Sequence, residues 1–457
     1  MKKIISVLLT LIMLTVTVSA AVLGDSDGDG EITVSDALSA LRIAASLEAY
    51  NSSADVDGDG KVTVSDALQI LRYCVGFITS DGLDGNYDIE FKVPDGAKGL
   101  GLTDEMIKRG VVSLGDPSRI VNVMRKAQAG EDVTLGFIGG SVTVGGAATT
   151  FETRYARVVY NWWADTFPNS NTGYVNAGFS GTPSLFAVHR LEEHLMYAEP
   201  DLVVIEFGVN DELQDWQQEA YASLVRRILT DDCAPAVLLF FVMNNGGTCA
   251  QADQVPIGEF YDLPMVSYRD AIWPEVEKGT YVWKDICADW VHPTDKGHAI
   301  CGNIIIGLLE AVYKNIDHLS SEIKPVRDDV PLPYLYENTY WYHKGNTTPL
   351  SYGSFKETTS GIASWEHVGD GSEPLVLRVY GKRIILPILQ GESDFITASI
   401  SVDGETPIML NNKSNLLISA GQMAYYKLYE SETPKWHTVE ITRIDGKMSV
   451  CGLYLSW

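Results

Sequence analysis

Five positions that lie far apart in the sequence combine the groups that acyl transfer needs. Ser141 follows two glycines and offers a hydroxyl as nucleophile, and His292 offers an imidazole to take its proton and return it to a leaving alcohol. Asp289, three residues before the histidine, can accept from the other ring nitrogen and fix the tautomer. The backbone N–H groups of Ser141 and Gly181 and the side-chain amide of Asn210 can donate to the oxyanion of a tetrahedral intermediate. Together these groups predict ester hydrolysis through a covalent intermediate.

Each of these residues also has an ordinary structural interpretation. A serine after glycines is common at strand-to-helix turns, and Asn210 suits the cap of a helix. Asp289 and His292 suit a loop. Only their joint occurrence is specific.

Other polar groups in the same region carry less information. His189 and His194 are five residues apart, so a helix does not place them on one face as a zinc-binding pair requires, and we interpret them as helix surface. His298 is predicted to have a structural role. Asp211 and Asp215 suggest a carboxylate pair for glycoside hydrolysis, but nothing else in the sequence supports that activity.

The elements that must position the five groups alternate between strands and helices over residues 88–320. Apolar runs of strand length are Val133–Ile138, Leu202–Phe207 and Ala236–Val242, with shorter candidates at Tyr174–Asn176 and Pro264–Val266. Helical patterns lie between them, for example Tyr155–Trp163 and Tyr221–Leu229. This alternation predicts an α/β domain with a parallel sheet covered on both faces. Ligands of such folds bind beyond the carboxyl ends of the strands, where Ser141 and Asn210 lie.

The motifs around these residues resemble those of the SGNH, or GDSL-type, hydrolase family. Four blocks match: Gly139-Gly140-Ser141, Ser180-Gly181-Thr182, Gly208-Val209-Asn210-Asp211 and Asp289-Trp290-Val291-His292. The resemblance covers the whole central domain and implies a three-layer α/β/α fold and hydrolysis of esters or thioesters. Gly140 stands where many members have Asp, and Thr182 stands where Asp is frequent. The residue before the serine is not catalytic in this scheme, so the first departure bears on the subgroup rather than on activity.

Two acidic segments near the N-terminus repeat each other at a spacing of 30 residues. A hard cation such as Ca²⁺ takes about six to eight oxygen ligands, which a loop of about 12 residues supplies from carboxylates and one backbone carbonyl. The predicted ligands are Asp25, Asp27, Asp29, Glu31 and Asp36 in the first loop and Asp55, Asp57, Asp59, Lys61 and Asp66 in the second, with Glu31 and Lys61 supplying the backbone carbonyls.

From residue 24 to residue 80 this stretch resembles a type I dockerin. Position 12 of each loop is Asp rather than the Glu of an EF-hand, and one helix follows each loop. The resemblance implies that two Ca²⁺ ions fold the module and that it binds a cohesin domain of a scaffold protein. Residues implied in the choice of cohesin are Val34-Ser35, Val64-Ser65, Arg42 and Arg72. The alternative is an acidic solvated loop, which two fully occupied sets of carboxylate positions disfavour.

The first residues predict export. Lys2 and Lys3 precede the apolar run Ile4–Val18, and Val18-Ser19-Ala20 offers small residues for cleavage. This pattern predicts a secretory signal over residues 1–20 rather than a membrane anchor, for which the run is short. Residues 81–87 read as a polar linker.

Charge and cysteine content restrict the function further. With 34 basic and 60 acidic residues the net charge is −26, which leaves no basic patch for phosphates and argues against nucleic-acid binding. The six cysteines show no CxxC pairing, and their spacing assigns no disulfide. Cys287 and Cys301 flank the His292 region and are the one candidate bridge.

Residues 330–457 change to short extended segments and predict an all-β sandwich. The segments are Leu375–Tyr380, Ile384–Pro387, Ile396–Val402, Trp436–Arg443 and Ser449–Trp457. The domain looks similar to the jelly-roll domains that accompany carbohydrate esterases. Its aromatic residues Tyr340, Trp341, Tyr342 and Trp365 either stack on sugars or belong to the core of the sandwich, and the sequence does not decide between these roles.

The combined pattern favours a secreted esterase that removes acetyl groups from plant polysaccharide, either xylan, mannan or pectin, while docked to a cellulosome. The substrate class follows mainly from the resemblance to dockerins, whose usual cargo degrades plant cell walls. One alternative is a feruloyl-type or lipid esterase, and another is a non-catalytic carbohydrate-binding or scaffold component. We expect no catalytic cofactor and no nucleic-acid or membrane partner.

Overall fold

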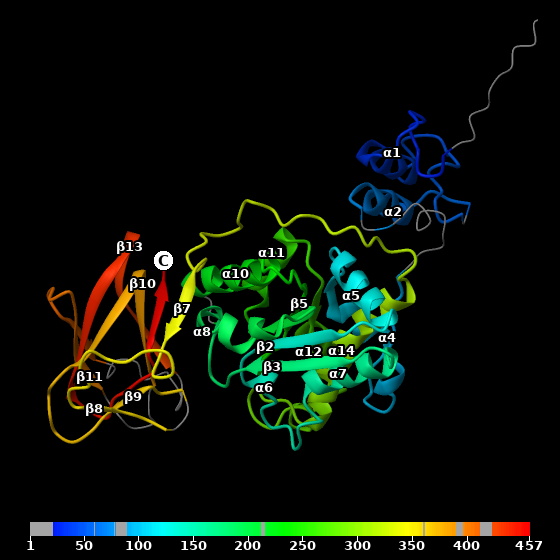
Figure 1. Ribbon diagram of the computed structural model, residues 1–457. Coiled ribbons are helices and arrows are strands. Elements are labelled where there is room, and N and C mark those ends of the chain that lie inside the picture. The colour runs from blue at the N-terminus through cyan, green and yellow to red at the C-terminus, as the bar shows by residue number, and fades with distance from the viewer. Residues whose placement is uncertain are drawn as a thin grey trace, which may run out of the picture. The chain divides into compact units, whose positions relative to one another are not determined.

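The structure is a computed structural model of the chain (Figure 1). It describes residues 22–58, 60–76, 78, 89–211, 215–359, 362–389, 396–411 and 423–457. The predicted signal, the predicted linker and the predicted calcium ligand Asp59 lie outside these residues. The chain divides into two compact units, Met1–Asp88 with His318–Ser320 and Ile89–Asp317 with Ser321–Trp457.

In the N-terminal unit one short helix follows each acidic loop. Helix α1 spans Val34–Ala44 and helix α2 spans Val64–Cys74. Each begins with a capping box, in which Thr33 or Thr63 accepts a backbone hydrogen bond and the aspartate three residues later bonds back to the threonine N–H. Those aspartates are Asp36 and Asp66, the last positions of the predicted loops. The same carboxylates therefore end a loop and start a helix.

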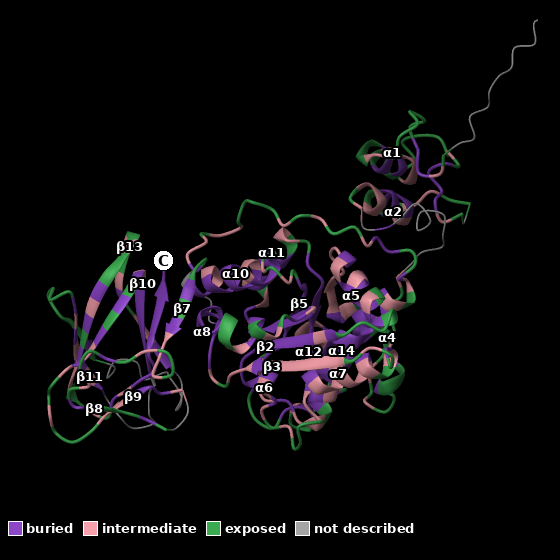
Figure 2. Ribbon diagram, in the orientation of Figure 1, coloured by how far each residue is buried: buried purple, intermediate pink, exposed green. Residues whose placement is uncertain are grey.

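The larger unit contains a six-stranded sheet of order β1-β6-β5-β4-β2-β3. Its strands are β1 Val111–Ser113, β2 Val133–Gly139, β3 Thr172–Gly178, β4 Leu202–Glu206, β5 Ala236–Phe241 and β6 Met265–Ser267. All neighbours are parallel except β1, a short antiparallel edge strand that the sequence did not predict. The central strands β2, β4 and β5 are buried, whereas the edge strand β3 is half-buried (Figure 2).

Helices cover both faces of this sheet, which confirms the predicted three-layer α/β fold (Figure 1). Helix α14 packs against α4, α5, α7 and α12, and α10 packs against α8 and α11. The helices are η1 Asp95–Ala97, α4 Asp104–Gly110, α5 Ser118–Gln128, α6 Ser141–Val144, α7 Tyr155–Thr166, α8 Ser184–His189, α9 Leu191–His194, η2 Met196–Ala198, α10 Asp215–Leu229, α11 Gln251–Phe260, α12 Tyr268–Glu277, α13 Trp283–Ile286 and α14 Asp295–Lys314. Among the described residues, no helix has the length and apolar character needed to cross a bilayer. We call this part, residues 89–317, the α/β domain.

The rest of the larger unit, which we call the β-domain, is a nine-stranded antiparallel sheet around its own apolar core. Its strands are β7 Thr339–Tyr342, β8 Phe355–Glu357, β9 Trp365–His367, β10 Leu375–Leu389, β11 Thr397–Val402, β12 Ile408–Asn411, β13 Met423–Asp445, β14 Ser449–Val450 and β15 Leu453–Ser456. Two predicted segments, Leu375–Tyr380 and Ile384–Pro387, are one strand, β10. The pairing register shifts between Gly381 and Arg383, and this irregularity interrupts the sequence pattern without ending the strand.

The four aromatic residues singled out in this domain divide between its interior and its surface. Trp365 is fully buried in the core and Trp341 is 7% exposed, so of the two alternatives left open by the sequence these residues take the role in packing. Tyr340 is 39% exposed and Tyr342 is half-buried, and both line a groove. The other residues of the groove are Tyr380, Trp436, Leu455 and Trp457. Alternate residues of β7 thus face opposite sides, as a strand requires.

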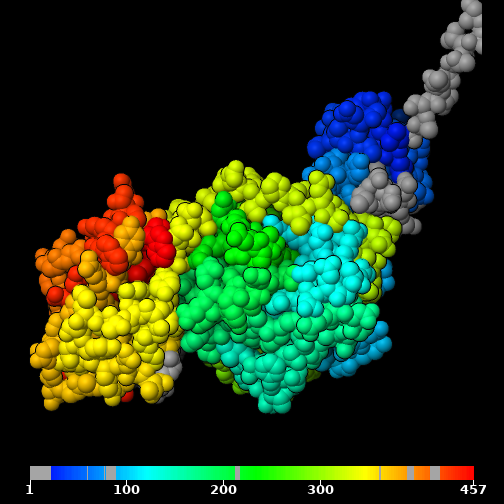
Figure 3. All heavy atoms as spheres, viewed as in Figure 1, coloured from blue at the N-terminus to red at the C-terminus, as the bar shows by residue number. Residues whose placement is uncertain are grey.

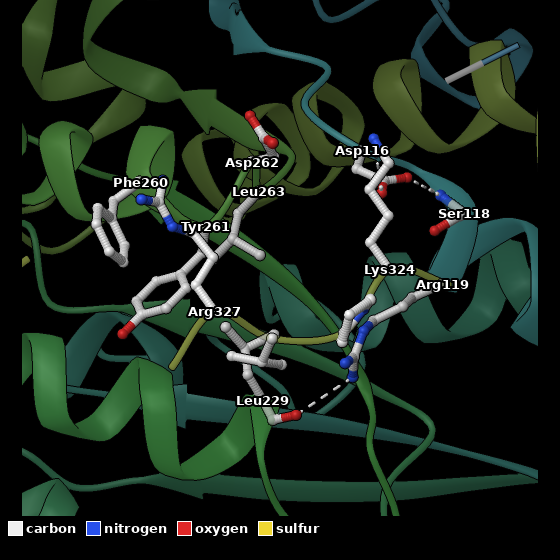
Figure 4. Close-up of a pocket in the computed structure, with 12 residues that line it drawn as sticks. Asp116, Ser118, Arg119, Leu229, Phe260, Tyr261, Asp262, Leu263, Lys324 and Arg327 are labelled. Atoms are coloured by element: carbon white, nitrogen blue, oxygen red, sulfur yellow. Dashed lines mark hydrogen bonds and ion pairs between the residues drawn. The ribbon is translucent and has the colours of Figure 1, made fainter. Parts of the chain in front are cut away.

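The segment from Ser321 to β7 runs along the surface of the α/β domain (Figure 3). Asn122 of α5 donates to the Ser321 carbonyl at 2.7 Å, and Arg226 of α10 donates to the Arg327 carbonyl at 2.6 Å. This segment also lines a surface cavity with Arg119, with Leu229 at the end of α10 and with the residues that precede β6 (Figure 4). The cavity therefore lies at the amino ends of the parallel strands, opposite the edge where ligands of such sheets bind.

Candidate active site

The predicted nucleophile Ser141 lies in the turn that connects β2 to α6, which we call the nucleophile turn. Strand β2 ends at Gly139, Gly140 precedes the helix, and α6 begins at Ser141. A Cβ atom on Gly140 would lie 1.8 Å from Asn210 Oδ1, and one on Gly139 would lie 2.1 Å from Thr143 Oγ1. Because the Asn210 side chain occupies this space, the turn has no room for the aspartate that many SGNH sequences carry at position 140.

Asp289 and His292 lie in a short loop before α14. The Ala288 N–H donates to the His292 carbonyl at 2.8 Å and closes this loop. Inside it, Asp289 Oδ1 accepts hydrogen bonds from the N–H groups of Val291 and His292, both at 2.8 Å. The loop thus holds the carboxylate beside the imidazole by local hydrogen bonds.

The structure brings Ser141, His292 and Asp289 into one hydrogen-bonded chain. His292 Nε2 lies 2.8 Å from Ser141 Oγ, and its Nδ1 lies 2.7 Å from Asp289 Oδ2. A proton on Nδ1 donates to the carboxylate and leaves Nε2 to accept the serine proton, which is the arrangement of a general base. Ser141 is 9% exposed, whereas the side chains of His292 and Asp289 are 27% and 46% exposed. The site therefore opens to solvent on the imidazole side.

Hydrogen bonds determine the charge of Asp289. Burial alone raises its pKa, but the N–H and imidazole of His292 and the N–H of Val291 outweigh that effect and hold the pKa below its ordinary value. The carboxylate is therefore ionised at neutral pH and can stabilise an imidazolium.

Asn210 reaches the nucleophile turn from the loop after β4. Its Oδ1 is buried against Gly140 and has no hydrogen-bond partner among the described residues. A Cβ atom on Gly140 would lie 1.8 Å from Asn210 Oδ1 and 3.1 Å from Nδ2, so the whole amide lies close to the turn. The structure thus places the predicted donor residue directly beside the residue that precedes Ser141.

Gly181 lies in a turn that follows β3. Its φ is +69°, a left-handed conformation that favours glycine. The Thr182 hydroxyl donates to the Phe179 carbonyl at 2.8 Å, and the Phe179 N–H donates to the Gly139 carbonyl at 2.9 Å. The second hydrogen bond connects the turn to the end of β2. The first shows that Thr182, which stands where Asp is frequent in the family, stabilises the turn itself.

Asp211 fastens the two predicted donor loops to each other, a role that the sequence analysis missed. Its Oδ1 accepts from the Ser184 N–H at 2.9 Å, just past the Gly181 turn, and its Oδ2 accepts from Gln254 Nε2 at 3.0 Å. Burial raises the pKa of Asp211 to about 7, although these hydrogen bonds lower it. Its position in the block Gly208-Val209-Asn210-Asp211 was the available signal, whereas the sequence suggested a chemical role for it only as a carboxylate pair with Asp215, whose side chain lies outside the described residues.

Two further residues support the nucleophile turn and were not predicted. Glu206, the last residue of β4, is fully buried, and its Oε2 accepts from the Thr143 hydroxyl at 3.2 Å, while its Oε1 has no hydrogen-bond partner in the part of the chain that the structure describes. Burial raises the pKa of Glu206 to about 8. Asn176, in β3, donates its amide to the Thr143 carbonyl at 2.7 Å. Both lie at the carboxyl ends of predicted strands, which was the only signal available.

The other histidines do not join the site. The His298 ring accepts from the Tyr155 N–H at 3.3 Å and donates to the Gly146 carbonyl at 3.0 Å, which fits a structural role. The surface position expected for His189 is wrong. His189 is 5% exposed and stacks on Tyr454 at 4.8 Å, because the β-domain covers this face of α8.

The cysteines are free thiols in the structure. The candidate bridge between Cys287 and Cys301 is therefore wrong. Both side chains are buried in the α/β domain, where they contribute to its packing.

The acidic loops gather their carboxylates as a hard cation requires. Carboxylate oxygens of three residues lie within 4.8 Å of one another in each loop, from Asp25, Asp27 and Asp29 in the first and from Asp55, Asp57 and Asp66 in the second. Asp55 Oδ1 is buried without a partner. Desolvation and repulsion by Asp36, Asp29 and Asp25 raise the pKa of Asp27. Clustered like charges and an orphaned oxygen fit a Ca²⁺ ligand set.

Two family models match the chain. Residues 137–300 match the GDSL-like lipase/acylhydrolase family, and residues 23–74 match the type I dockerin domain, which binds calcium. None of the curated proteins compared with the chain matches it.

Solved structures of similar proteins are two-domain esterases. A two-domain esterase (CEX) active on acetylated mannans, co-crystallised with mannopentaose, is 30% identical, with a TM-score of 0.68, and the match covers 77% of this chain and 97% of that one. A second structure of a two-domain esterase (CEX) active on acetylated mannans is also 30% identical, with a TM-score of 0.67 and coverage of 77% and 98%. The similarity therefore extends over nearly the whole length of these esterases.

Proposed function

The chain belongs to the GDSL-like lipase/acylhydrolase family and is a carboxylic ester hydrolase with a type I dockerin, and from this we propose that it removes acetyl groups from plant cell-wall polysaccharide through Ser141, His292 and Asp289. One observation carries the proposal. The serine hydroxyl, the imidazole and the carboxylate form a chain of hydrogen bonds of 2.8 and 2.7 Å at the carboxyl edge of the sheet.

The first half of the reaction transfers the acetyl group to the enzyme. Ser141 Oγ attacks the acetyl carbonyl carbon while His292 Nε2 takes the hydroxyl proton. The resulting oxyanion accepts from the N–H groups of Ser141 and Gly181 and from Asn210 Nδ2. The intermediate collapses, its bond to the sugar oxygen breaks, and His292 returns the proton to that oxygen. Asp289 stays ionised throughout and stabilises the imidazolium.

The second half releases acetate. Water enters from the exposed imidazole side and loses a proton to His292 Nε2 as its oxygen attacks the acetyl carbon. The same three donors stabilise the second oxyanion. When this intermediate collapses, the bond to Ser141 Oγ breaks and His292 returns the proton to the serine.

Among xylan, mannan and pectin, we propose acetylated mannan as the preferred polymer. The support is the 30% identity to esterases active on acetylated mannans, which the chain matches over 97% and 98% of their lengths. The groove of the β-domain offers a second contact for the polymer, since five of its six lining residues are aromatic and can stack on sugar rings. We favour a sugar over a protein partner here, because the groove has six lining residues whereas a stable protein interface uses roughly 20 to 30 residues a side.

The test is acetate release from acetylated mannan, xylan and pectin, with a feruloylated arabinoxylan and a long-chain acyl ester as competing substrates. The wild type should release acetate fastest from mannan, and Ser141→Ala should lower kcat by about 10⁶-fold or to background. Faster hydrolysis of the feruloyl or long-chain ester would instead support the alternative esterases. Equal background release by both proteins from every ester would contradict the triad and favour a non-catalytic carbohydrate-binding or scaffold role.

We also propose that the dockerin attaches a secreted enzyme to a cohesin domain of a scaffold protein. Two Ca²⁺ ions would be held by the carboxylates of Asp25, Asp27, Asp29, Asp36, Asp55, Asp57, Asp59 and Asp66, and by the carbonyls of Glu31 and Lys61. The bound cations supply positive charge that offsets the clustered carboxylates. The module should bind immobilised cohesin in calcium and lose binding in excess chelator, and undiminished binding in chelator would contradict this role.

A further inference from the structure

Arg190 is a buried cation that has no ion pair with a carboxylate among the described residues. It follows α8 and is 1% exposed. Within the described part of the chain its Nε has no partner, Nη1 reaches His194 Nδ1 at 3.4 Å, and Nη2 reaches the Gly139 carbonyl at 3.5 Å. Burial lowers the pKa of Arg190 to about 10, so it stays protonated at neutral pH.

Two aromatic rings of the α/β domain face this guanidinium, and rings of the β-domain pack against one of them. It lies 5.1 Å from the ring centroid of Phe186 and 5.8 Å from that of Phe179. The β-domain covers Phe186 from the other side, with Tyr454 stacked at 5.4 Å and Trp341 edge-on at 5.0 Å. Phe186 thus links the Arg190 guanidinium to the aromatic residues of the β-domain.

The same guanidinium lies behind the catalytic turn. The Gly139 carbonyl, which it approaches, also accepts from the Phe179 N–H at 2.9 Å. One residue separates Gly139 from Ser141, and one separates Phe179 from Gly181. A single carbonyl thus joins the two loops that carry the proposed backbone donors.

A buried charge without a counter-charge costs folding free energy, so its presence calls for an explanation. We propose that Arg190, held by the aromatic face of the β-domain, is a positioning residue that fixes the Gly139 carbonyl and the Phe179 turn, so that the donors at Ser141 and Gly181 meet the oxyanion. Its positive charge also favours a negative oxygen in this low-dielectric region. The β-domain is then part of the catalytic centre. This inference rests on the proposed acyl-transfer function.

Arg190→Met tests the inference with p-nitrophenyl acetate, whose small acyl and leaving groups make the assay independent of polymer binding. Removing a direct oxyanion donor costs about 100- to 1000-fold in kcat, so an indirect support should cost about 10- to 100-fold, with KM little changed. Arg190→Lys, which keeps the charge, should recover part of the loss. Tyr454→Leu should lower kcat in the same way, because it keeps the arginine in the chain but removes the ring that stacks on Phe186 and holds the guanidinium in position.

Arg119→Met is the matched control. Arg119 is a partly buried arginine at the opposite edge of the sheet, and it also donates to backbone carbonyls, those of Ala234 at 2.9 Å and Pro235 at 3.0 Å. Figure 4 shows its further contact with the Leu229 carbonyl at 3.4 Å. Its loss should lower the melting temperature and leave kcat unchanged. If Arg190→Met behaves like this control, Arg190 is only structural and the inference is overturned.

Two further outcomes separate the possible failures. If Arg190→Met does not fold, Arg190→Lys and Tyr454→Leu test the inference in its place. A wild-type kcat in both variants would overturn the inference. A wild type that is inactive on p-nitrophenyl acetate and on every polymer would contradict the proposed function itself. If the wild type is active and Arg190→Met and Tyr454→Leu are equally active, only the proposed role of Arg190 is contradicted.

Discussion

The catalytic turn and the dockerin loops both gather carboxylates and backbone N–H groups, but they satisfy their charges differently. Around the turn, the partners come from the chain: Asp289 accepts three hydrogen bonds from its own loop, and Asp211 accepts from Ser184 and Gln254. In the loops, three carboxylates face one another within 4.8 Å, and Asp55 Oδ1 has no partner. The carboxylates of Asp289 and Asp211 are therefore paired within the chain, whereas the loop carboxylates cluster as ligands of a cation do.

Removal of calcium should have the largest effect, and only on one of the two regions. Residues 24–80 hold ten acidic and three basic residues, a charge of −7, so without cations the loops repel and the two helices lose their capping aspartates. A ligand at 1,000 times its Kd stabilises a fold by about 4.1 kcal/mol, which chelation would remove. Hydrogen exchange of residues 22–76 in the full chain should rise sharply in EGTA, while hydrolysis of p-nitrophenyl acetate stays unchanged. Equal protection with and without EGTA would contradict the need of the loops for calcium. Loss of esterase activity in EGTA would contradict the independence of the esterase from that calcium.

Asp289→Asn should produce the next largest effect, now in the catalytic centre. An amide cannot hold the imidazole in the tautomer that leaves Nε2 unprotonated, so kcat should fall by about 10³- to 10⁴-fold. Asp285→Asn, an exposed aspartate four residues earlier, is the control and should keep wild-type kcat. Steady-state kinetics on p-nitrophenyl acetate measure both. A fall of less than about tenfold for Asp289→Asn would indicate that the imidazole is oriented by other groups.

Asn210→Ala should have a smaller effect on rate and almost none on stability. Loss of one oxyanion donor lowers kcat by about 100- to 1000-fold. The melting temperature should hardly change, because the Asn210 side chain already leaves Oδ1 unpaired. Kinetics and thermal denaturation of the same sample separate the two effects. A large fall in melting temperature with little change in kcat would instead make Asn210 a structural residue.

The two regions also differ in how far the sequence reveals them. The loops are local, so spacing alone names every ligand position. The triad joins residues up to 151 apart, and the motifs identified its members only as separate blocks. Residues whose roles depend on packing between elements left only their positions beside a motif or at a strand end as a signal, and these positions do not name their partners. Asp211, Glu206 and Arg190 act through partners from other elements, and the burial of His189 and Trp341 follows from the contact between the two domains.

Glu206 differs from Asp289 because burial, rather than hydrogen bonding, decides its protonation. Like the loop carboxylates it has no cation beside it among the described residues, and it is neutralised by a proton instead of a metal ion. Burial raises its pKa from 4.5 to about 8, so between these values the folded protein holds a proton that the unfolded chain has released. Folding stability is therefore highest at or below pH 4.5 as far as this group is concerned, and it falls as pH rises towards 8, by at most about 1.4 kcal/mol per pH unit.

Glu206→Gln should remove this dependence, because an amide has no proton to lose while its oxygen can still accept from the Thr143 hydroxyl. Urea denaturation from pH 5 to pH 9 should show a flatter stability profile for the variant than for the wild type, with the difference growing in the variant's favour as pH rises. Some slope should remain, because burial also raises the pKa of Asp211 to about 7. Parallel profiles would mean that Glu206 is ionised in the folded state. Hydrogen bonds would then stabilise the ionised carboxylate of Glu206, as they do that of Asp289. Both acids would then differ from the loop carboxylates, whose charges we expect a bound cation to offset.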